Sequence, residues 1–327
     1  MVFKNYFACA LALCCLTYPA RGAGIQLLET PTLAGAIWYP CAAKPQSVPL
    51  GSLGMPLANS LEGVKDCPVA GAKLPLVVFS HGQGGWFGLH HDTAEALADA
   101  GFVVAAISHP GDNGKDTSQS ETLSNWASRP ADIVHLIDFM LKDWKDRDAI
   151  DSSKIGFFGF SKGAYTGLVL AGATLDFQRT ASYCKDNSRF CEQVRSGDVP
   201  KNLPRDARIK AAVVADPAPT VAFTKSTLSP IDIPLQVWRS ESGAKDRGVN
   251  PEGVARVLDA LPGQPEVHIV PAGHFAFHPP CSAELAANLP RFCTDPVGFD
   301  RAAFHRDFDA SVVRFFRDHL AGDGGVR

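Results

Sequence analysis

Residues 155–171 read IGFFGFSKGAYTGLVLA, and this stretch decides the fold. Ile155–Phe158 is an apolar run typical of a buried strand, and Ala164–Ala171 is typical of a helix. Between them, Gly159-Phe160-Ser161-Lys162-Gly163 has the pattern G-x-S-x-G. After a strand and before a helix, this pattern is typical of a sharp, strained turn that presents a serine, because its glycines remove clashing side chains. We therefore interpret Ser161 as a nucleophile, against the alternative of an ordinary tight turn.

Apolar runs elsewhere in the chain predict the rest of the fold. Strands are expected at 25–29, 33–39, 76–80, 102–107, 209–215, 235–238 and 267–270, and helices at 94–100, 133–141 and 312–320. Continuous apolar strands separated by helices indicate an α/β fold whose mostly parallel sheet has helices on both faces. Residues 40–73 lack periodicity and are expected to be a surface excursion. We expect one domain over 23–327, with an insertion without strands at about 173–208.

The N-terminus has the pattern of a secretory signal peptide. Lys4 precedes an apolar run at 6–16, Pro19 ends that run, and the small residues within 20–22 fit a cleavage site. The run is too short to span a bilayer as a helix. We expect residues 1–22 to be removed on export; a lipid or membrane anchor is the alternative.

The cysteines and the net charge indicate disulfides and argue against two kinds of ligand, a metal ion and a nucleic acid. Six cysteines follow the signal, and in an exported chain their even number suggests disulfides, of which Cys41–Cys67, Cys184–Cys191 and Cys281–Cys293 close the shortest loops. The chain contains no C-x-x-C pair, so a cysteine metal site is disfavoured. The net charge of −3 argues against a nucleic-acid partner, which would call for a basic surplus.

A serine hydroxyl needs a base, and His274 is the best candidate. It follows the last predicted strand in a short loop, whereas the other histidines lie in predicted helices or strands or end other strands. Asp216 and Asp246 both lie between the serine and the histidine in the chain and both follow a strand. Spacing alone does not choose between them as the acid that orients His274.

An oxyanion formed at the serine needs hydrogen-bond donors. One donor is expected to be the backbone N–H of Lys162, directly after the nucleophile, and the second the backbone N–H of Gln83 in the glycine-rich loop 81–85. The loop lacks the G-x-G-x-x-G pattern of a dinucleotide site. The Lys162 side chain is expected to be solvated, with attraction of an acidic substrate group as the alternative.

Several motifs together resemble the α/β-hydrolase superfamily: Phe79-Ser80-His81-Gly82-Gln83-Gly84, Ser108-His109-Pro110, Arg129-Pro130-Ala131-Asp132-Ile133 and the G-x-S-x-G turn. Within it the chain is similar, over about 74–277, to predicted dienelactone-hydrolase-like proteins and to platelet-activating-factor acetylhydrolases. The acetylhydrolase resemblance implies Asp216 as the acid, with oxyanion donors at Gln83 and Lys162. Dienelactone hydrolases use a cysteine nucleophile where this chain has Ser161, so a dienelactone substrate is not implied.

The sequence thus leads us to expect a secreted or periplasmic serine ester hydrolase of the esterase, lipase or acetylhydrolase kind. Ser161, His274 and Asp216 would form the triad, and the substrate would be a small-molecule or lipid ester. No metal or organic cofactor and no stable membrane span are expected. The alternatives are a peptidase or amidase on the same fold, and a binding protein that keeps the fold without catalysis.

Overall fold

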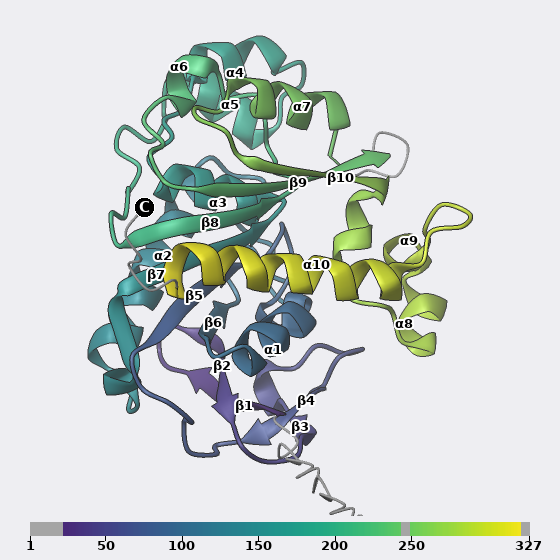
Figure 1. The fold of residues 1–327 in the computed structure, drawn as a ribbon. Coiled ribbons are helices and arrows are strands. Elements are labelled where there is room, and N and C mark those ends of the chain that lie inside the picture. The colour runs from purple at the N-terminus through teal and green to yellow at the C-terminus, as the bar shows by residue number, and fades with distance from the viewer. Residues whose placement is uncertain (1–21, 243–248, 322–327) are drawn as a thin grey trace, which may run out of the picture.

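A single ten-stranded sheet organises the molecule (Figure 1). The structure, a computed structural model, describes residues 22–242 and 249–321. In the sheet the strands lie in the order β10-β9-β8-β7-β5-β6-β2-β1-β4-β3. They are β1 (Gly22–Glu29), β2 (Ala34–Cys41), β3 (Gln46–Pro49), β4 (Ser60–Lys65), β5 (Leu74–Ser80), β6 (Val103–Ile107), β7 (Ile150–Phe160), β8 (Ile209–Ala215), β9 (Leu235–Ser242) and β10 (Glu266–Gly273).

The sheet is mostly parallel, as predicted. Strands β5 to β10 pair in parallel with one another, whereas β2 is antiparallel to both β6 and β1. Successive residues of one strand enter different cores: Phe157 packs in one apolar cluster and Phe158 in the other. Both side chains are fully buried, so the sheet is covered on both faces.

Helices provide that cover. They are α1 (His91–Asp99), α2 (Ser124–Lys142), α3 (Lys162–Leu170), α4 (Phe177–Tyr183), α5 (Arg189–Ser196), α6 (Lys225–Leu228), α7 (Pro251–Ala260), α8 (Ala283–Asn288), α9 (Pro290–Cys293) and α10 (Arg301–Phe316), with single turns η1 (Gly51–Leu53), η2 (Phe87–His90), η3 (Arg147–Ala149), η5 (His274–Phe277) and η6 (Arg317–Ala321). Apolar residues of α2 and α3 share a cluster with Phe157, and those of α1 and α10 share the cluster of Phe158. Figure 1 shows α10 lying across the sheet on the α1 side.

Residues 40–73, which we expected to be a surface excursion without periodicity, contain two strands. Strands β3 and β4 form an antiparallel pair there, and β4 extends the sheet by pairing in parallel with β1. Val48 alone is buried among the four residues of β3. A short edge strand that buries one residue leaves too weak an alternation to be recognised in a Pro- and Gly-rich sequence.

The insertion at 173–208 contains no strand, and the structure describes all of it. It forms the short helices α4 and α5, which the polar sequence did not reveal. Their aromatic residues pack on α2, where the ring centroid of Phe190 lies 5.0 Å and that of Phe177 6.3 Å from Trp126. The insertion is therefore attached to the body of the sheet domain.

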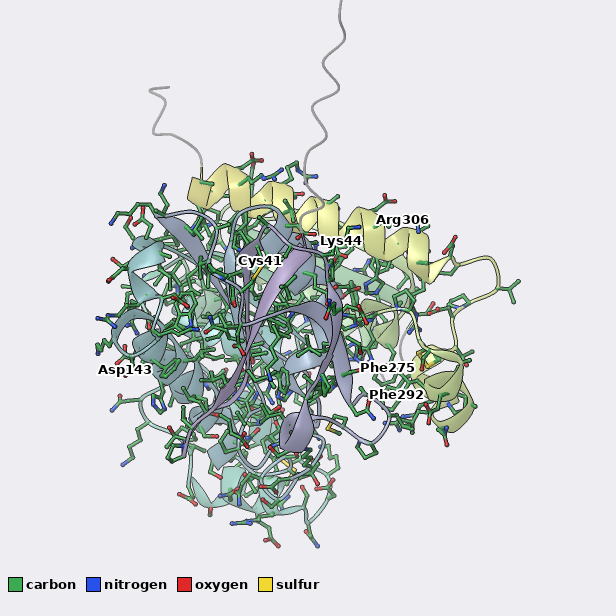
Figure 2. The ribbon with its side chains drawn as sticks, turned by 90° about the horizontal axis from the view of Figure 1, so that it is seen from below. Cys41, Lys44, Asp143, Phe275, Phe292 and Arg306 are labelled. Atoms are coloured by element: carbon green, nitrogen blue, oxygen red, sulfur yellow. A yellow bond between two sulfur atoms is a disulfide. The ribbon has the colours of Figure 1, made fainter. Side chains whose placement is uncertain are left out.

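All three predicted disulfides are present: Cys41–Cys67, Cys184–Cys191 and Cys281–Cys293. Their Cα–Cα distances are 6.5, 5.3 and 5.8 Å, within the range that a disulfide spans. Figure 2 labels Cys41, which ends β2. Across the described ranges, no helix is both long enough and apolar enough to cross a bilayer. The predicted signal peptide falls outside the described residues apart from Gly22, the first residue of β1.

Candidate active site

The candidate nucleophile sits in the turn between β7 and α3. Ser161 has φ 57° and ψ −115°, a conformation that side-chain-bearing residues rarely adopt. Its N–H donates to the carbonyl of Ala215 at 2.8 Å, which fixes the turn to the end of the neighbouring strand. A Cβ at Gly163 would overlap the carbonyl oxygen of Ser80, so only glycine fits there. The G-x-S-x-G stretch therefore forms the strained strand-to-helix corner that its sequence predicted.

His274 reaches the same place from the far end of the chain. It opens η5 directly after β10, and 7% of it is exposed. Its ring stacks on Phe160, the residue before Ser161, with centroids 4.5 Å apart and planes 28° apart. Its Nδ1 lies 2.9 Å from Oδ2 of Asp216. Nε2 has no hydrogen-bond partner within the described residues, so it is free to serve a neighbouring hydroxyl.

Asp216 is held to orient that imidazole. It directly follows β8, is fully buried and has φ 46°. Its Oδ1 accepts from the N–H of Ser240 at 2.8 Å, and its Oδ2 accepts from the Ser240 hydroxyl at 2.5 Å as well as facing His274. Three donors thus surround one carboxylate and hold it aimed at the imidazole. The other candidate acid, Asp246, lies outside the described residues.

The two predicted oxyanion donors lie close to Ser161. Lys162 is the first residue of α3, a position whose N–H has no partner inside the helix. The loop that holds Gln83 comes against the nucleophile at Gly82, where a Cβ would lie 3.2 Å from the Cβ of Ser161. In the part of the chain that the structure describes, no acceptor is bonded to the Gln83 N–H. The Gln83 side chain is exposed and donates to Glu121.

His81 fixes the orientation of the Gln83 N–H. Its Nδ1 contacts the carbonyl oxygen of Gly82 at 2.6 Å, while its Nε2 accepts from the N–H of His109 at 3.1 Å. Nδ1 is therefore the protonated nitrogen. Burial and the nearby Arg129 lower the pKa of His81 to about 3, which keeps the ring neutral. Since C=O and N–H of a trans peptide point in opposite directions, a Gly82 carbonyl held by His81 leaves the Gln83 N–H on the other side.

A second Ser-His-Asp constellation lies behind the first. The Ser80 hydroxyl is 2.9 Å from Nε2 of His109, and Nδ1 of His109 is 2.9 Å from Asp132. Ser80 and His109 are fully buried, so no substrate reaches them. Burial also holds the pKa of His109 well below its usual value and raises that of Asp132 to about 7. The sequence motifs that contain these three residues did not predict that they meet.

The prediction that the Lys162 side chain is solvated is wrong. It is 4% exposed, and its Nζ donates to the carbonyl of Ser120 at 2.7 Å and pairs with Asp112 at 3.1 Å. The carboxylate of Asp112 also pairs with Arg129 at 2.7 Å, and both of these side chains are fully buried. A buried ammonium needs such partners, so the side chain is unavailable to a substrate.

The segment after His274 forms an aromatic wall beside it. The ring of Phe275 packs edge-on against Phe292 with centroids 4.6 Å apart, and the guanidinium of Arg291 lies 4.5 Å from the Phe292 centroid. Figure 2 shows Phe275 and Phe292 side by side near α8 and α9. The Cys281–Cys293 disulfide closes this excursion. The sequence of residues 281–293 contains no catalytic motif. It therefore gave no sign that this segment packs against the loop that holds His274.

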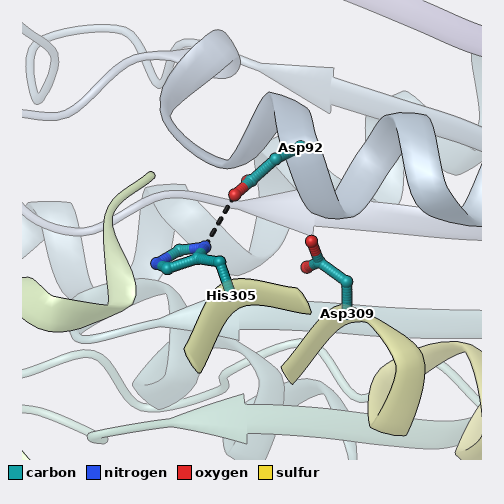
Figure 3. A group of neighbouring side chains, drawn as sticks. All are labelled: Asp92, His305 and Asp309. Carbon is teal, nitrogen blue, oxygen red and sulfur yellow. Dashed lines mark hydrogen bonds and ion pairs between the residues drawn. The ribbon is translucent and has the colours of Figure 1, made fainter. Parts of the chain in front are cut away.

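A group of possible metal ligands lies between α1 and α10 (Figure 3). It consists of Asp92, His305 and Asp309, whose donor atoms lie within 4.8 Å of one another. Both nitrogens of His305 are engaged: Nδ1 lies 2.6 Å from Asp92 and Nε2 2.9 Å from the carbonyl of Ala276 in η5. The group thus ties the turn that begins at His274 to both helices.

Comparisons with known proteins agree with this architecture. Residues 59–127 match a family model described as platelet-activating factor acetylhydrolase, isoform II. A ferulic acid esterase from Streptomyces cinnamoneus has a similar structure, with a TM-score of 0.57 at 19% identity over 94% of this chain and 92% of that one. A dienelactone hydrolase from Anabaena variabilis gives a TM-score of 0.47 at 18% identity over 85% of this chain and 100% of that one. None of the curated proteins matches the chain in sequence. The chain has the α/β-hydrolase fold, as predicted.

Proposed function

We propose that the chain is a secreted serine hydrolase that cleaves carboxylic esters. The observation that carries the proposal is the contact of His274 with Asp216, made while the imidazole stacks on the residue before the strained Ser161. A hydroxyl at a strained corner, an imidazole with one free nitrogen and a fully bonded carboxylate are the parts that acyl transfer needs.

The reaction runs in two halves. The Ser161 oxygen attacks the ester carbonyl while Nε2 of His274 takes its proton, and the charge on the imidazole is balanced by Asp216. The carbonyl oxygen becomes an oxyanion that accepts from the N–H groups of Gln83 and Lys162. Collapse expels the alcohol, which receives the proton from His274. Water, deprotonated by the same imidazole, then attacks the acyl-enzyme, releases the acid and restores Ser161.

The comparisons support an ester as the substrate. The acetylhydrolase match at 59–127 includes the 81–85 loop and Asp112, which are parts of the site. The similar structure is described as a ferulic acid esterase. Both are hydrolases of the ester class, so we infer the same bond type for this chain. No metal or organic cofactor takes part in the proposed mechanism.

Export is the second part of the proposal. The signal-peptide pattern at 1–22 and three disulfides both fit a chain that matures outside the cytoplasm, in the periplasm or the medium.

The test uses the mature chain and a p-nitrophenyl ester series of increasing acyl length. We expect hydrolysis and stoichiometric labelling by a fluorophosphonate, and Ser161→Ala should abolish the labelling and lower kcat by more than about 10⁴-fold. Ser153→Ala is the matched control, since this exposed serine lies on the same strand at its other end. It should behave as wild type.

Two outcomes would replace the proposal. A folded wild-type chain that neither hydrolyses esters nor reacts with the fluorophosphonate would be a binding protein with this fold. Faster turnover of p-nitroanilides than of p-nitrophenyl esters with the same acyl group would make the chain an amidase.

A further inference from the structure

A buried group of charges lies beneath the two oxyanion donors. Asp112 and Arg129 are fully buried and Lys162 is 4% exposed. Asp112 lies in the loop after β6, Arg129 in α2 and Lys162 at the start of α3, so three separate parts of the chain bring them together. Burial alone would raise the pKa of Asp112, but Arg129 and Lys162 hold it well below its usual range, so the carboxylate is charged.

The two oxygens of the Asp112 carboxylate accept from different pairs of donors. Oδ1 accepts from the N–H of Gly84 at 3.0 Å and from the hydroxyl of Ser120 at 2.5 Å. Oδ2 accepts from Arg129 at 2.7 Å and from Lys162 at 3.1 Å. The carboxylate is thus saturated by four donors and has no lone pair to offer a ligand.

These contacts connect the two halves of the oxyanion site. Gly84 directly follows Gln83, the donor on the loop after β5, and Lys162 is itself the donor at the start of α3. Arg129 adds a third attachment, because it also donates to the carbonyl of His81 at the base of the same loop. The loop after β5 and the turn after β7 are therefore joined through one fully buried side chain.

We propose that Asp112 is a positioning residue, which sets the spacing between the Gln83 and Lys162 N–H groups by holding Gly84 on one carboxylate oxygen and the Lys162 side chain on the other. This inference rests on the proposed function. A displacement of about 1 Å between catalytic groups can cost about 10²-fold in rate, so holding the two donors in register matters as much as supplying them.

A purely structural role and a positioning role for Asp112 predict different effects of its substitution on kcat. If the charges only stabilise the fold, a variant that stays folded keeps its kcat. If Asp112 positions the donors, the variant loses affinity for the transition state while its affinity for the ground state is kept, because the oxyanion exists only after attack.

The experiment compares Asp112→Asn with Lys162→Met. The asparagine keeps an oxygen for Gly84 but loses the charge that faces Lys162. The methionine keeps the backbone N–H of residue 162 and leaves the Asp112–Arg129 pair intact, so it tests the connection even if Asp112→Asn unfolds. Asp206→Asn is the matched control, because Asp206 is also buried and paired with an arginine, Arg208. It lies just before β8, at the amino end of that strand, whereas Asp216 follows the carboxyl end.

Three constants are measured: kcat and KM on a p-nitrophenyl ester, and the Ki of a trifluoromethyl ketone, whose adduct with the serine carries the oxyanion. For Asp112→Asn we expect kcat to fall and Ki to rise by about 10²-fold, with KM changed less than about threefold. Lys162→Met should likewise lower kcat and raise Ki, each by about tenfold. Asp206→Asn should leave kcat, KM and Ki unchanged.

The inference is overturned if folded Asp112→Asn and Lys162→Met keep the wild-type kcat and Ki. It is also overturned if KM rises by the same factor as Ki, or if neither variant unfolds cooperatively. Failure of the proposed function has a different signature: the wild-type chain is inert, or its activity survives Ser161→Ala.

Discussion

Replacing Asp216 by asparagine changes one carboxylate oxygen into an amide nitrogen and tests the acid of the proposed triad. The left-handed backbone at φ 46° is one that asparagine adopts readily, so the substitution is compatible with the turn. The remaining oxygen keeps the bond from the Ser240 N–H, because that N–H can only donate. The new amide then faces Nδ1 of His274, and the Ser240 hydroxyl can reverse to accept from it.

An amide that donates to Nδ1 of His274 forces the proton onto Nε2. The imidazole then has no lone pair for the Ser161 proton, so the base is in the wrong tautomer. Asparagine in place of a triad aspartate lowers kcat by about 10⁴-fold. This corresponds to about 5 kcal/mol of lost transition-state stabilisation. We expect KM to change little, since Asp216 is buried behind the histidine.

The assay is steady-state hydrolysis of a p-nitrophenyl ester, with circular dichroism and thermal unfolding to verify the fold. Asp206→Asn, at the other end of β8, is the control and should retain kcat. A folded Asp216→Asn protein that retains more than about a tenth of the wild-type kcat would refute the reasoning. If Asp246→Asn were the inactive variant instead, the acid would be the residue that the sequence left as an alternative.

Two further predictions follow from buried groups. Ser80→Ala should remain stoichiometrically labelled by a fluorophosphonate while its melting temperature falls, because Nε2 of His109 loses its only hydroxyl partner at a cost of about 1–3 kcal/mol; loss of labelling would make Ser80 the nucleophile. Burial and the neighbouring Asp92 raise the pKa of Asp309 from 3.8 to about 7, so its contribution to stability is present below pH 3.8 and is lost as the pH rises through 7. In urea unfolding, Asp309→Asn should therefore gain on the order of 2 kcal/mol over wild type at pH 8 and nothing at pH 4, and an equal difference at both pH values would contradict this.

The parallel strands were predictable because their sequences are continuous apolar runs. The strand predicted at 209–215 matches β8 residue for residue, and its last five residues, 211–215, are fully buried. The edge strand β3 and its neighbour β4 were missed for the opposite reason. They bury so few side chains that burial left no pattern in their sequence.

The geometry of the candidate site was predictable where neighbouring residues in the sequence decide it. The turn at Ser161 follows from two glycines and the change from strand to helix, and His274 follows from its position after the last strand. The fate of the Lys162 side chain could not be predicted in this way, because its partners Asp112 and Ser120 come from another loop. Nothing at the spacing of the motif indicates which distant carboxylate will lie beneath it.

The same limit applies to Ser80, His109 and Asp132, which have the residue types and the hydrogen bonds of a catalytic triad. They differ from Ser161, His274 and Asp216 in the backbone conformation of the serine and in its access to solvent. Ser80 is the last residue of a regular strand and is fully buried, whereas Ser161 occupies a strained corner and retains 9% exposure.

Ser80, His109 and Asp132 instead support the loop that holds Gln83. Ser80 directly precedes His81, and the backbone N–H of His109 donates to the His81 ring that holds the Gly82 carbonyl. An imidazole fixed between a hydroxyl and a carboxylate cannot rotate, so it also fixes the backbone to which it belongs. A buried Ser-His-Asp group beside a loop can thus aim a backbone N–H, and such a geometry identifies a candidate nucleophile only where the serine also reaches solvent.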